Sequence, residues 1–598
     1  MLQTIKKILY LLPAGDRFKI FIIFLMMLLG AFLEIIGIGI IPVFVSIVAS
    51  PDTILKIEWL KPVWDIFNIE SGGDLLVYGA ICLIAVFFAK NAYIVFYQYT
   101  QSRFIWGRFA VIGGELFKRY MYAPYEFHLM RNSSELLRNV TREAQYVAQN
   151  VLLSFLKLAM DVILIAGICA MLLLIEPVIT LIVIVLLGGG AALFLRLIRK
   201  KLSKYGLTAQ QDRGHMITSV NEGLGGIKDA RVLNREQWFF KRFFYHIRRY
   251  SKSQVFRQVS SSANKPVIET IAVSGMLLIM LILYWQGRGL DSVIPLMALF
   301  GVATLRLMPA IREMTAQVAN LRYYIYSVDP IYDDTIKLSS EKVVNREKNT
   351  EILKFEKEIR FEGVKYSYPG SDIQAVNEIS LAIPRDYSVG IVGTSGAGKT
   401  TLVDLLLGLL IPQNGIITVD DTDIHTNISG WQRNIGYIPQ FIFLADDTIR
   451  RNISFGLSDE EVEDNKLRNA IEAAQLSELV NSLPRGVETI IGERGTRLSG
   501  GQRQRIGIAR ALYHKPQLLI MDEATSALDS VTEKYVVEAI ERLKGERTII
   551  MIAHRLTTVE KCDMLYLMHH GSIVDSGSYE VLIERNRDFR KMALSFTE

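Results

Sequence analysis

A glycine-rich loop in the C-terminal half of the chain has the residue types needed to hold phosphate. It comprises Gly393, Thr394, Ser395, Gly396, Ala397, Gly398, Lys399, Thr400 and Thr401. The loop follows a predicted strand at 387–392 and precedes a predicted helix at 402–410, the setting that the pattern GxxxxGK[ST] requires. Glycines let backbone N–H groups curl around phosphate oxygens, and the lysine reaches the β- and γ-phosphates. The loop therefore predicts a nucleoside triphosphate site, with Thr400 as a ligand of Mg²⁺.

Two adjacent carboxylates, Asp522 and Glu523, end an apolar run at 518–521 that predicts a strand. Asp522 suits the metal ion of a phosphate site, and Glu523 is placed to polarise an attacking water. A glycine-rich pentapeptide precedes them, formed by Leu498, Ser499, Gly500, Gly501 and Gln502, and a helix is predicted after it at 503–513. Small residues let a helix N-terminus approach a phosphate, although alone this segment is equally a helix cap.

The N-terminal half is apolar enough to span a membrane repeatedly. Hydrophobic residues make up 50% of the chain and charged residues 21%, which indicates two unlike halves. Six apolar runs predict six spans, at 20–48, 75–97, 153–175, 178–197, 267–286 and 291–311. The first run is too long for a signal peptide and lacks a cleavage site at its end. Lys and Arg gather in the connections on one side of the predicted spans, and cytoplasmic connections are the ones enriched in these residues. Both termini lie on that side, so they are expected in the cytoplasm. The sequence therefore predicts an integral membrane protein.

Two long polar connections, at about 100–150 and 200–265, predict helices that continue into the cytoplasm, turn and return. Their tips are expected near 127–135 and 221–226. Residues 327–357 have alternating charges and predict a linker. The expected fold is therefore multidomain, with an all-α six-helix transmembrane domain at 1–326 and an α/β P-loop NTPase domain at 358–598.

The order of these motifs resembles the ATP-binding cassette (ABC) transporter family, in which Leu498–Gln502 is the signature. The resemblance covers nearly the whole chain and is strongest over 358–590. It implies that Tyr368 stacks on adenine, Gln440 acts in catalysis and binds the metal with Thr400 and Asp522, Asp529 forms the D-loop, His554 steadies the γ-phosphate, and Glu493 contacts the membrane helices. Six spans before one cassette resemble an exporter-type half-transporter.

The resemblance also implies the cofactors and partners. Two copies would form a homodimer, with each ATP and its Mg²⁺ between Lys399 of one subunit and Ser499–Gly501 of the other, and hydrolysis would separate the cassettes. The expected location is a bacterial inner membrane, among its lipids. The net charge, +6 from 67 Lys and Arg against 61 Asp and Glu, does not indicate a nucleic-acid partner.

The cargo is suggested by cations inside the predicted spans. Lys90, Arg306 and Arg312 would form a cationic lining for an anionic head group, because guanidinium binds phosphate bidentately. Ion pairing within the protein, or snorkelling near span ends, is the alternative. The segments 51–70, 221–236 and 305–314 are similar to PglK-type flippases, which implies a lipid-linked oligosaccharide pyrophosphate. A multidrug or peptide exporter would share every ATPase motif and stays open.

Overall fold

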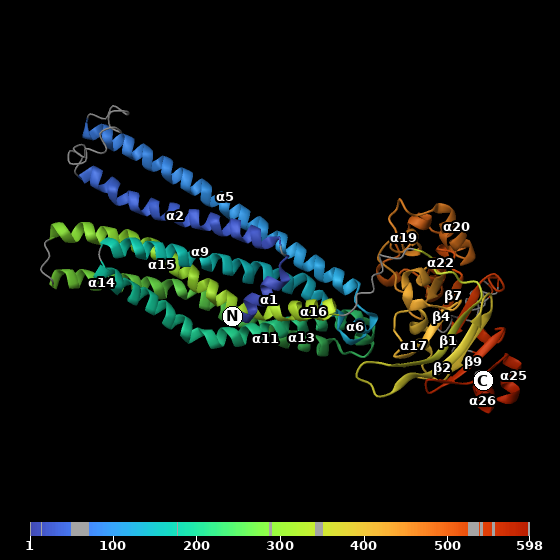
Figure 1. The fold of residues 1–598 in the computed structure, drawn as a ribbon. Coiled ribbons are helices and arrows are strands. Elements are labelled where there is room, and N and C mark those ends of the chain that lie inside the picture. The colour runs from blue at the N-terminus through green and yellow to red at the C-terminus, as the bar shows by residue number, and fades with distance from the viewer. Residues whose placement is uncertain are drawn as a thin grey trace. The chain divides into compact units, whose positions relative to one another are not determined.

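Long helices form the first part of the chain in the computed structural model (Figure 1). The structure describes residues 2–13, 15–49, 71–175, 177–285, 290–340, 351–523, 538, 542–552 and 556–595. The chain divides into two compact units, Met1–Ala123 with Arg131–Val343, and Pro124–Met130 with Val344–Glu598. The short segment Pro124–Met130 therefore packs with the cassette half, although it lies in the N-terminal half of the sequence.

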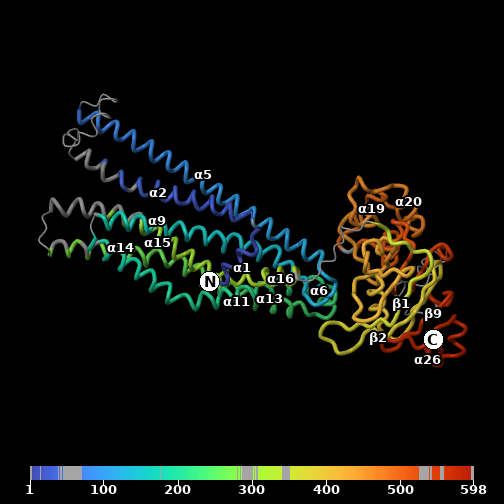
Figure 2. Tube along the Cα trace, viewed as in Figure 1, coloured from blue at the N-terminus to red at the C-terminus, as the bar shows by residue number. Residues whose placement is uncertain are grey.

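The first unit is helical throughout its described length. Its main helices are α1 (Leu2–Leu11), α2 (Asp16–Ala49), α5 (Gly72–Met121), α7 (Ser133–Arg138), α9 (Leu153–Ile175), α10 (Pro177–Val183), α11 (Gly189–Gly225), α12 (Ile227–Val232), α13 (Glu236–Ser262), α14 (Asn264–Trp285), α15 (Leu290–Tyr324) and α16 (Val328–Ser340). A capping box begins α5, because the Ser71 hydroxyl accepts from the Asp74 N–H and the Asp74 carboxylate accepts from the Ser71 N–H. Figure 2 shows α2 running beside α5, and α9 beside α15.

Five segments among the described residues are long and apolar enough to cross a membrane. They are Asp16–Gly37, Gly72–Met121, Ser133–Leu174, Thr180–Gly225 and Glu236–Ile282. The sixth predicted span, 291–311, falls within helix α15, most of whose side chains at 291–306 lie outside the described residues. That span stays a prediction. The stretch 51–70, compared above with flippases, also lies outside the described residues.

The two long polar connections are helical, as predicted. Helix α5 continues to Met121, and the return passes through α6 (Tyr125–Met130), α7 and π-helical turns into α9. The second connection is made by α11, which ends at Gly225, followed by α12 and α13. A Cβ on Gly206 of α11 would lie 2.3 Å from the backbone oxygen of Tyr323, so the glycine permits close packing of α11 on α15.

The predicted linker 327–357 is shorter in the structure, because its first part is helix α16. Val328, Ile331 and Leu338 are each almost fully buried, at spacings that place them on one face of a helix. The charges between them hid this face in the sequence. Residues 341–350 lie outside the described residues, and Phe355, also assigned to the linker, is buried in the cassette core.

The described residues of the cassette half form two sheets. The mixed sheet has the order β10-β9-β3-β8-β7-β6 and the antiparallel sheet the order β2-β1-β4-β5. Their strands are β1 (Glu358–Ser367), β2 (Gln374–Pro384), β3 (Ser388–Gly393), β4 (Asn414–Val419), β5 (Thr422–Asp423), β6 (Ile435–Ile438), β7 (Leu518–Asp522), β8 (Thr548–Ile552), β9 (Met564–His569) and β10 (Ser572–Gly577). Strands β9, β3, β8, β7 and β6 run parallel, and β7 and β8 are buried over their whole lengths, which explains their continuous apolar sequences.

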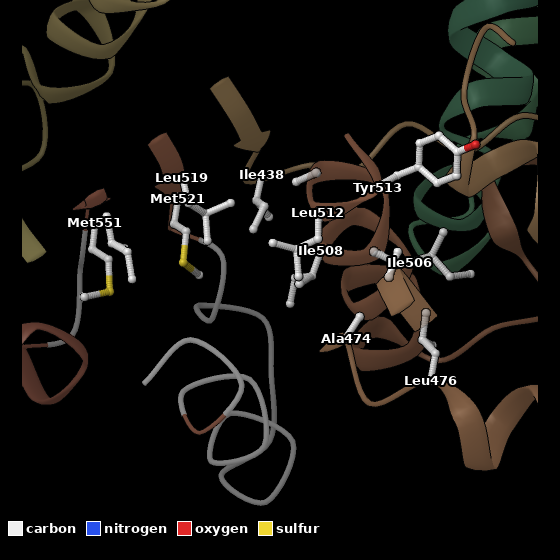
Figure 3. Packing of buried hydrophobic residues seen from close by; sticks show 14 of the residues in the cluster. Ile438, Ala474, Leu476, Ile506, Ile508, Leu512, Tyr513, Leu519, Met521 and Met551 are labelled. Atoms are coloured by element: carbon white, nitrogen blue, oxygen red, sulfur yellow. The ribbon is translucent and has the colours of Figure 1, made fainter. Parts of the chain in front are cut away.

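An apolar core joins this sheet to helix α22 (Gly500–Tyr513). Figure 3 shows Leu519 and Met521 of β7 near Ile508 and Leu512 of α22, within one buried cluster. Because the core fixes both elements, it also fixes the residues at their ends. The carboxylates at the end of β7 and the signature residues at the start of α22 are therefore positioned by one shared apolar core.

Candidate functional site

The glycine-rich loop connects the central strand β3 to helix α17 (Lys399–Leu406). Gly396 and Gly398 have φ angles of +78° and +96°, a region that favours glycine. A Cβ on Gly398 would lie 2.2 Å from the backbone oxygen of Ala375, so another residue would displace the loop. Thr394, Ser395 and Gly396 are exposed, as is Thr400 in the first turn of α17. The loop can thus present N–H groups and a hydroxyl at the N-terminus of a buried helix.

Lys399 is held over this loop. Its Nζ donates to the backbone oxygens of Gly393 at 2.9 Å and Thr394 at 3.0 Å. Burial lowers the pKa of Lys399, while the negative charges of Glu523 and Asp522 act in the opposite direction. The three predicted groups therefore share one site, in which the lysine charge is partly balanced by carboxylates.

Glu523 and Gln440 meet because their strands are neighbours. Strands β6 and β7 pair in parallel, with Ile438 opposite Met521, so the residues that come after them emerge at the same edge. There the Gln440 Nε2 donates to the Glu523 Oε2 at 2.5 Å. Glu523 has a φ angle of +48°, and its N–H donates to the backbone oxygen of Ile552. The arrangement fixes the carboxylate beside the loop that carries Lys399.

Asp522 is buried, and two further groups depend on its charge. Tyr437 hydrogen-bonds to it, and burial together with that charge raises the pKa of the Tyr437 hydroxyl. Burial and the charge of Asp522 also raise the pKa of Asp404 to about 6. The sequence analysis missed Tyr437 and Asp404. Tyr437 stands one residue before the end of strand β6, which precedes Gln440, and Asp404 lies within the apolar helix after the loop. These positions are signals that could have identified them.

Asp404→Asn is expected to stabilise the nucleotide-free protein by about 1–3 kcal/mol at pH 8, and by about half as much at pH 5. Because the folded-state pKa of about 6 lies above the ordinary value of 3.8, the folded protein binds more protons than the unfolded chain between these values. Stability is therefore lost as the pH rises from about 4 to about 6. Thermal unfolding of the full chain in detergent at both pH values checks this. Glu472→Gln, exposed on α20 (Asp464–Ala473), is the control, and an equal effect at both pH values would contradict the argument.

Tyr368 lies beside the helix that follows the loop. Its hydroxyl is 3.1 Å from the hydroxyl of Thr401, and its ring packs edge-on against Tyr366, with centroids 5.2 Å apart. Tyr366 is buried, and its hydroxyl donates to the Glu126 Oε1 at 2.7 Å. Burial raises the pKa of Tyr366. The segment Pro124–Met130 is thus tied by a hydrogen bond to Tyr366 of strand β1.

The signature residues form the start of α22. The Ser499 hydroxyl accepts from the Gln502 N–H at 3.2 Å, and the Gln502 side chain accepts from the Ser499 N–H at 2.9 Å. This is the helix cap that the sequence left open as an alternative. Ser499 and Gly500 are exposed, and within residues 351–523 no hydrogen bond joins 498–502 to the loop 394–398. The segment can therefore cap its helix and still offer N–H groups to a molecule from outside. Glu493, before it, is also exposed.

Three of the predicted site residues fall, wholly or in their side chains, outside the described residues. Asp529 and His554 lie outside the described residues, and so does the side chain of Arg306 in α15. The described residues show that the Lys90 Nζ donates to the Glu34 Oε2 at 3.2 Å, and that Lys90 is 3% exposed. This is the ion-pairing alternative, and it argues against a place for Lys90 in a cationic lining. Arg312 of α15 is exposed.

Comparisons with known proteins agree with this architecture. Residues 376–526 match the ABC transporter family, and residues 20–286 match the ABC transporter transmembrane region. An ATP-dependent lipid A-core flippase of Ralstonia nicotianae is 31% identical over 474 residues, 79% of each chain. One from Thiobacillus denitrificans is 29% identical over 542 residues, 90% of this chain and 92% of its own. The heterocyst differentiation ATP-binding protein HepA of Nostoc is 30% identical over 488 residues, 79% of this chain and 76% of its own.

A solved structure shows the same fold over almost the whole chain. It is that of a bacterial Atm1-family ABC exporter with ATP bound, with a TM-score of 0.79 and 21% identity, covering 97% of this chain and 98% of that one. The predicted fold class is confirmed, with a helical transmembrane domain followed by an α/β cassette. The chain belongs to the ABC transporter family and is an exporter-type half-transporter, an integral membrane protein whose cassette couples ATP hydrolysis to transport.

Proposed function

We propose that two copies of this chain form a flippase that moves an anionic amphipathic lipid across a bacterial inner membrane, with a lipid-linked oligosaccharide pyrophosphate as the specific cargo. The observation that carries the proposal is the similarity, over 79% or more of this chain, to two relatives that are lipid A-core flippases. Exposed Arg312 supports an anionic cargo, because guanidinium can bind phosphate through two N–H donors. Arg306 lies on the same helix.

We further propose that each ATP lies between two protomers. Lys399 and the loop 393–401 hold the phosphates, Tyr368 stacks on adenine, and Ser499–Gly501 of the second copy close the site. The exposed signature residues support this arrangement, because they remain available to a partner. Asp529 and His554 complete the site by the family pattern. Both cassettes, like both chain termini, would lie in the cytoplasm.

The same site has donors that suit Mg²⁺. This ion takes oxygen ligands, keeps several waters and is held by one or two protein groups together with phosphates. The Thr400 hydroxyl, the Gln440 amide and the Asp522 carboxylate are such donors. Burial, and after it the negative charge of Asp522, raises the pKa of Asp404, and a cation at Asp522 would offset the second of these effects. Mg²⁺ bound there would neutralise charge on the phosphates.

The chain's own groups then carry out hydrolysis. Glu523 positions and polarises the attacking water, and Gln440 orients the Glu523 carboxylate through the 2.5 Å hydrogen bond. Lys399 exchanges its two loop carbonyls for phosphate oxygens, which have the greater negative charge. Cleavage removes the phosphate contacts that hold the protomers together, so the cassettes can separate and the membrane helices can rearrange.

Transport in proteoliposomes tests the cargo. The panel is a fluorescent polyprenyl pyrophosphate glycan, a lipid A-type glycolipid, a neutral apolar drug and an apolar peptide, each with ATP, and with Glu523→Gln as the control without hydrolysis. ATP-dependent flipping of the pyrophosphate glycan is the expected result. Preference for the lipid A-type glycolipid would reject the pyrophosphate glycan as the cargo but retain the function of lipid flippase. Transport of the drug or the peptide alone would establish the multidrug or peptide alternative.

The cationic lining makes a separate prediction. Arg306→Ala and Arg312→Ala are each expected to slow flipping of the pyrophosphate lipid about tenfold, because each removes a charge-assisted contact worth about 1.5 kcal/mol. Initial flipping rates at equal protein and ATP concentrations measure this. Arg199→Ala, exposed on α11, is the matched control. Unchanged rates in both variants would remove the lining from the proposal.

A further inference from the structure

The chain passes between the two compact units at three places, and all three lie close in sequence to one hydrogen-bonded cluster. It enters the cassette unit after Ala123, leaves it after Met130, and enters it again after Val343. Tyr120 precedes the first crossing, Arg131 follows the second, and helix α16 precedes the third. The three segments through which the chain connects the units are therefore linked to one another by the hydrogen bonds of this cluster.

A single buried carboxylate makes that connection. Asp334 of α16 is 2% exposed and accepts three hydrogen bonds. The Tyr120 hydroxyl donates at 2.6 Å, the Arg131 Nη2 at 3.0 Å and the Asn139 Nδ2 at 3.2 Å. Tyr120 and Asn139 are also buried, and the Asn139 amide is 3.3 Å from the Tyr120 hydroxyl. A buried charge with several donors is fixed firmly, because each lost contact would leave a desolvated group.

Helix α16 is itself anchored on its other side. The Lys7 Nζ of α1 donates to Asp329 at 2.6 Å and lies over the ring of Tyr332, 4.9 Å from its centroid. Arg119 of α5 donates to the backbone oxygen of Thr335 at 3.2 Å. These contacts hold α16 as a helix against the membrane unit. The hydrogen bonds of Asp334 differ from these contacts, because in the sequence Tyr120 precedes the segment Pro124–Met130 and Arg131 follows it.

We propose that Asp334 is a positioning residue that makes the two flanks of Pro124–Met130 and the chain leading into the cassette move as one body. The segment is tied to the cassette strand through Glu126 and Tyr366, so a displacement of the cassette pulls on Tyr120 and Arg131. Asp334 passes that displacement to α16 and the membrane helices. Loss of the carboxylate is therefore expected to leave ATP-driven cassette closure intact and to weaken the response of the membrane helices. The inference rests on the proposed homodimer.

The role of Asp334 is tested by measuring, in the full-length dimer, the distance between two spin labels at the same position on the two protomers. One label is placed on native Cys82, which is exposed on α5, with Cys169 and Cys562 changed to serine. A second protein carries Val574→Cys, exposed on cassette strand β10, with Cys82 also changed to serine. ATP with vanadate is added to both. In wild type both distances are expected to shift. In Asp334→Asn the Val574→Cys distance is expected to shift as in wild type, while the Cys82 shift is largely lost.

The matched control is Asp333→Asn, a 65% exposed neighbour on the same helix, which is expected to behave as wild type. Equal Cys82 shifts in Asp334→Asn and wild type would overturn the inference alone. A wild type in which neither label gives a distance to a second protomer would overturn the homodimer on which it rests, and a wild type with distances but no ATP-dependent shift would overturn the inference. If Asp334→Asn does not fold, Tyr120→Phe removes one donor and decides in the same way: a reduced Cys82 shift supports the role of Asp334, and a full shift overturns it.

Discussion

Replacing Glu523 with glutamine is expected to lower ATP turnover by about 100-fold to 10,000-fold, the usual contribution of general acid–base catalysis. The substitution removes a carboxylate but keeps the shape of the side chain. It also keeps the backbone contact between Glu523 and Ile552, so the strand end is not disturbed. ATP affinity should stay close to wild type, because the phosphates are held by the loop and Lys399. Phosphate release and binding of a fluorescent ATP analogue measure the two quantities separately.

Glu546→Gln, at an exposed position of the same cassette, is the control for a lost carboxylate away from the site. Normal turnover in Glu523→Gln would remove the proposed role of Glu523. A fall in both turnover and ATP affinity would instead place the residue among the groups that bind the nucleotide. The 2.5 Å contact with Gln440 predicts that Gln440→Ala causes a smaller loss than Glu523→Gln, because it leaves the carboxylate in place.

The phosphate loop could be predicted from the sequence because its geometry is local. Gly396 and Gly398 adopt positive φ angles within the loop itself, and Lys399 lies directly at the start of the helix. The meeting of Gln440 with Glu523 is not local. It depends on the parallel register of β6 and β7, which are far apart in sequence, and only the family resemblance placed both residues in one site.

The membrane half shows the same limit. Apolar runs predicted spans, and the polar connections predicted helices, because these signals lie within single segments. The partners of charged residues depend on which helices pack together. The sequence therefore left Lys90 open between a cavity lining and an ion pair, and the packing of α2 on α5 gives it Glu34 as a partner. Helix α16 was read as a linker because Asp329, Asp333 and Asp334 look like a solvated run, although Asp334 is buried by donors from distant segments.

Mixed dimers are expected to show that each ATP is shared between two protomers. Protomers with Lys399→Ala and with Ser499→Arg can be combined in two ways, in a Glu523→Gln background that retains bound ATP. In the trans form the two substitutions are on different protomers, and one composite site keeps both Lys399 and Ser499. In the cis form both are on one protomer, and each composite site loses one of the two. We therefore expect about one retained ATP per trans dimer and none per cis dimer.

The comparison separates a shared site from a site within one chain, because the two arrangements predict opposite results. If the nucleotide were held by Lys399 and Ser499 of the same protomer, the cis dimer would keep one intact site in its unsubstituted half, and the trans dimer would keep none. Loss of the Ser499 cap costs about 1 kcal/mol of helix stability, too little to unfold the cassette. Tandem purification through two different affinity tags isolates the mixed dimers, and nucleotide retained after gel filtration is counted. Retention by the cis dimer alone would refute the shared site and, with it, separation of the protomers by hydrolysis.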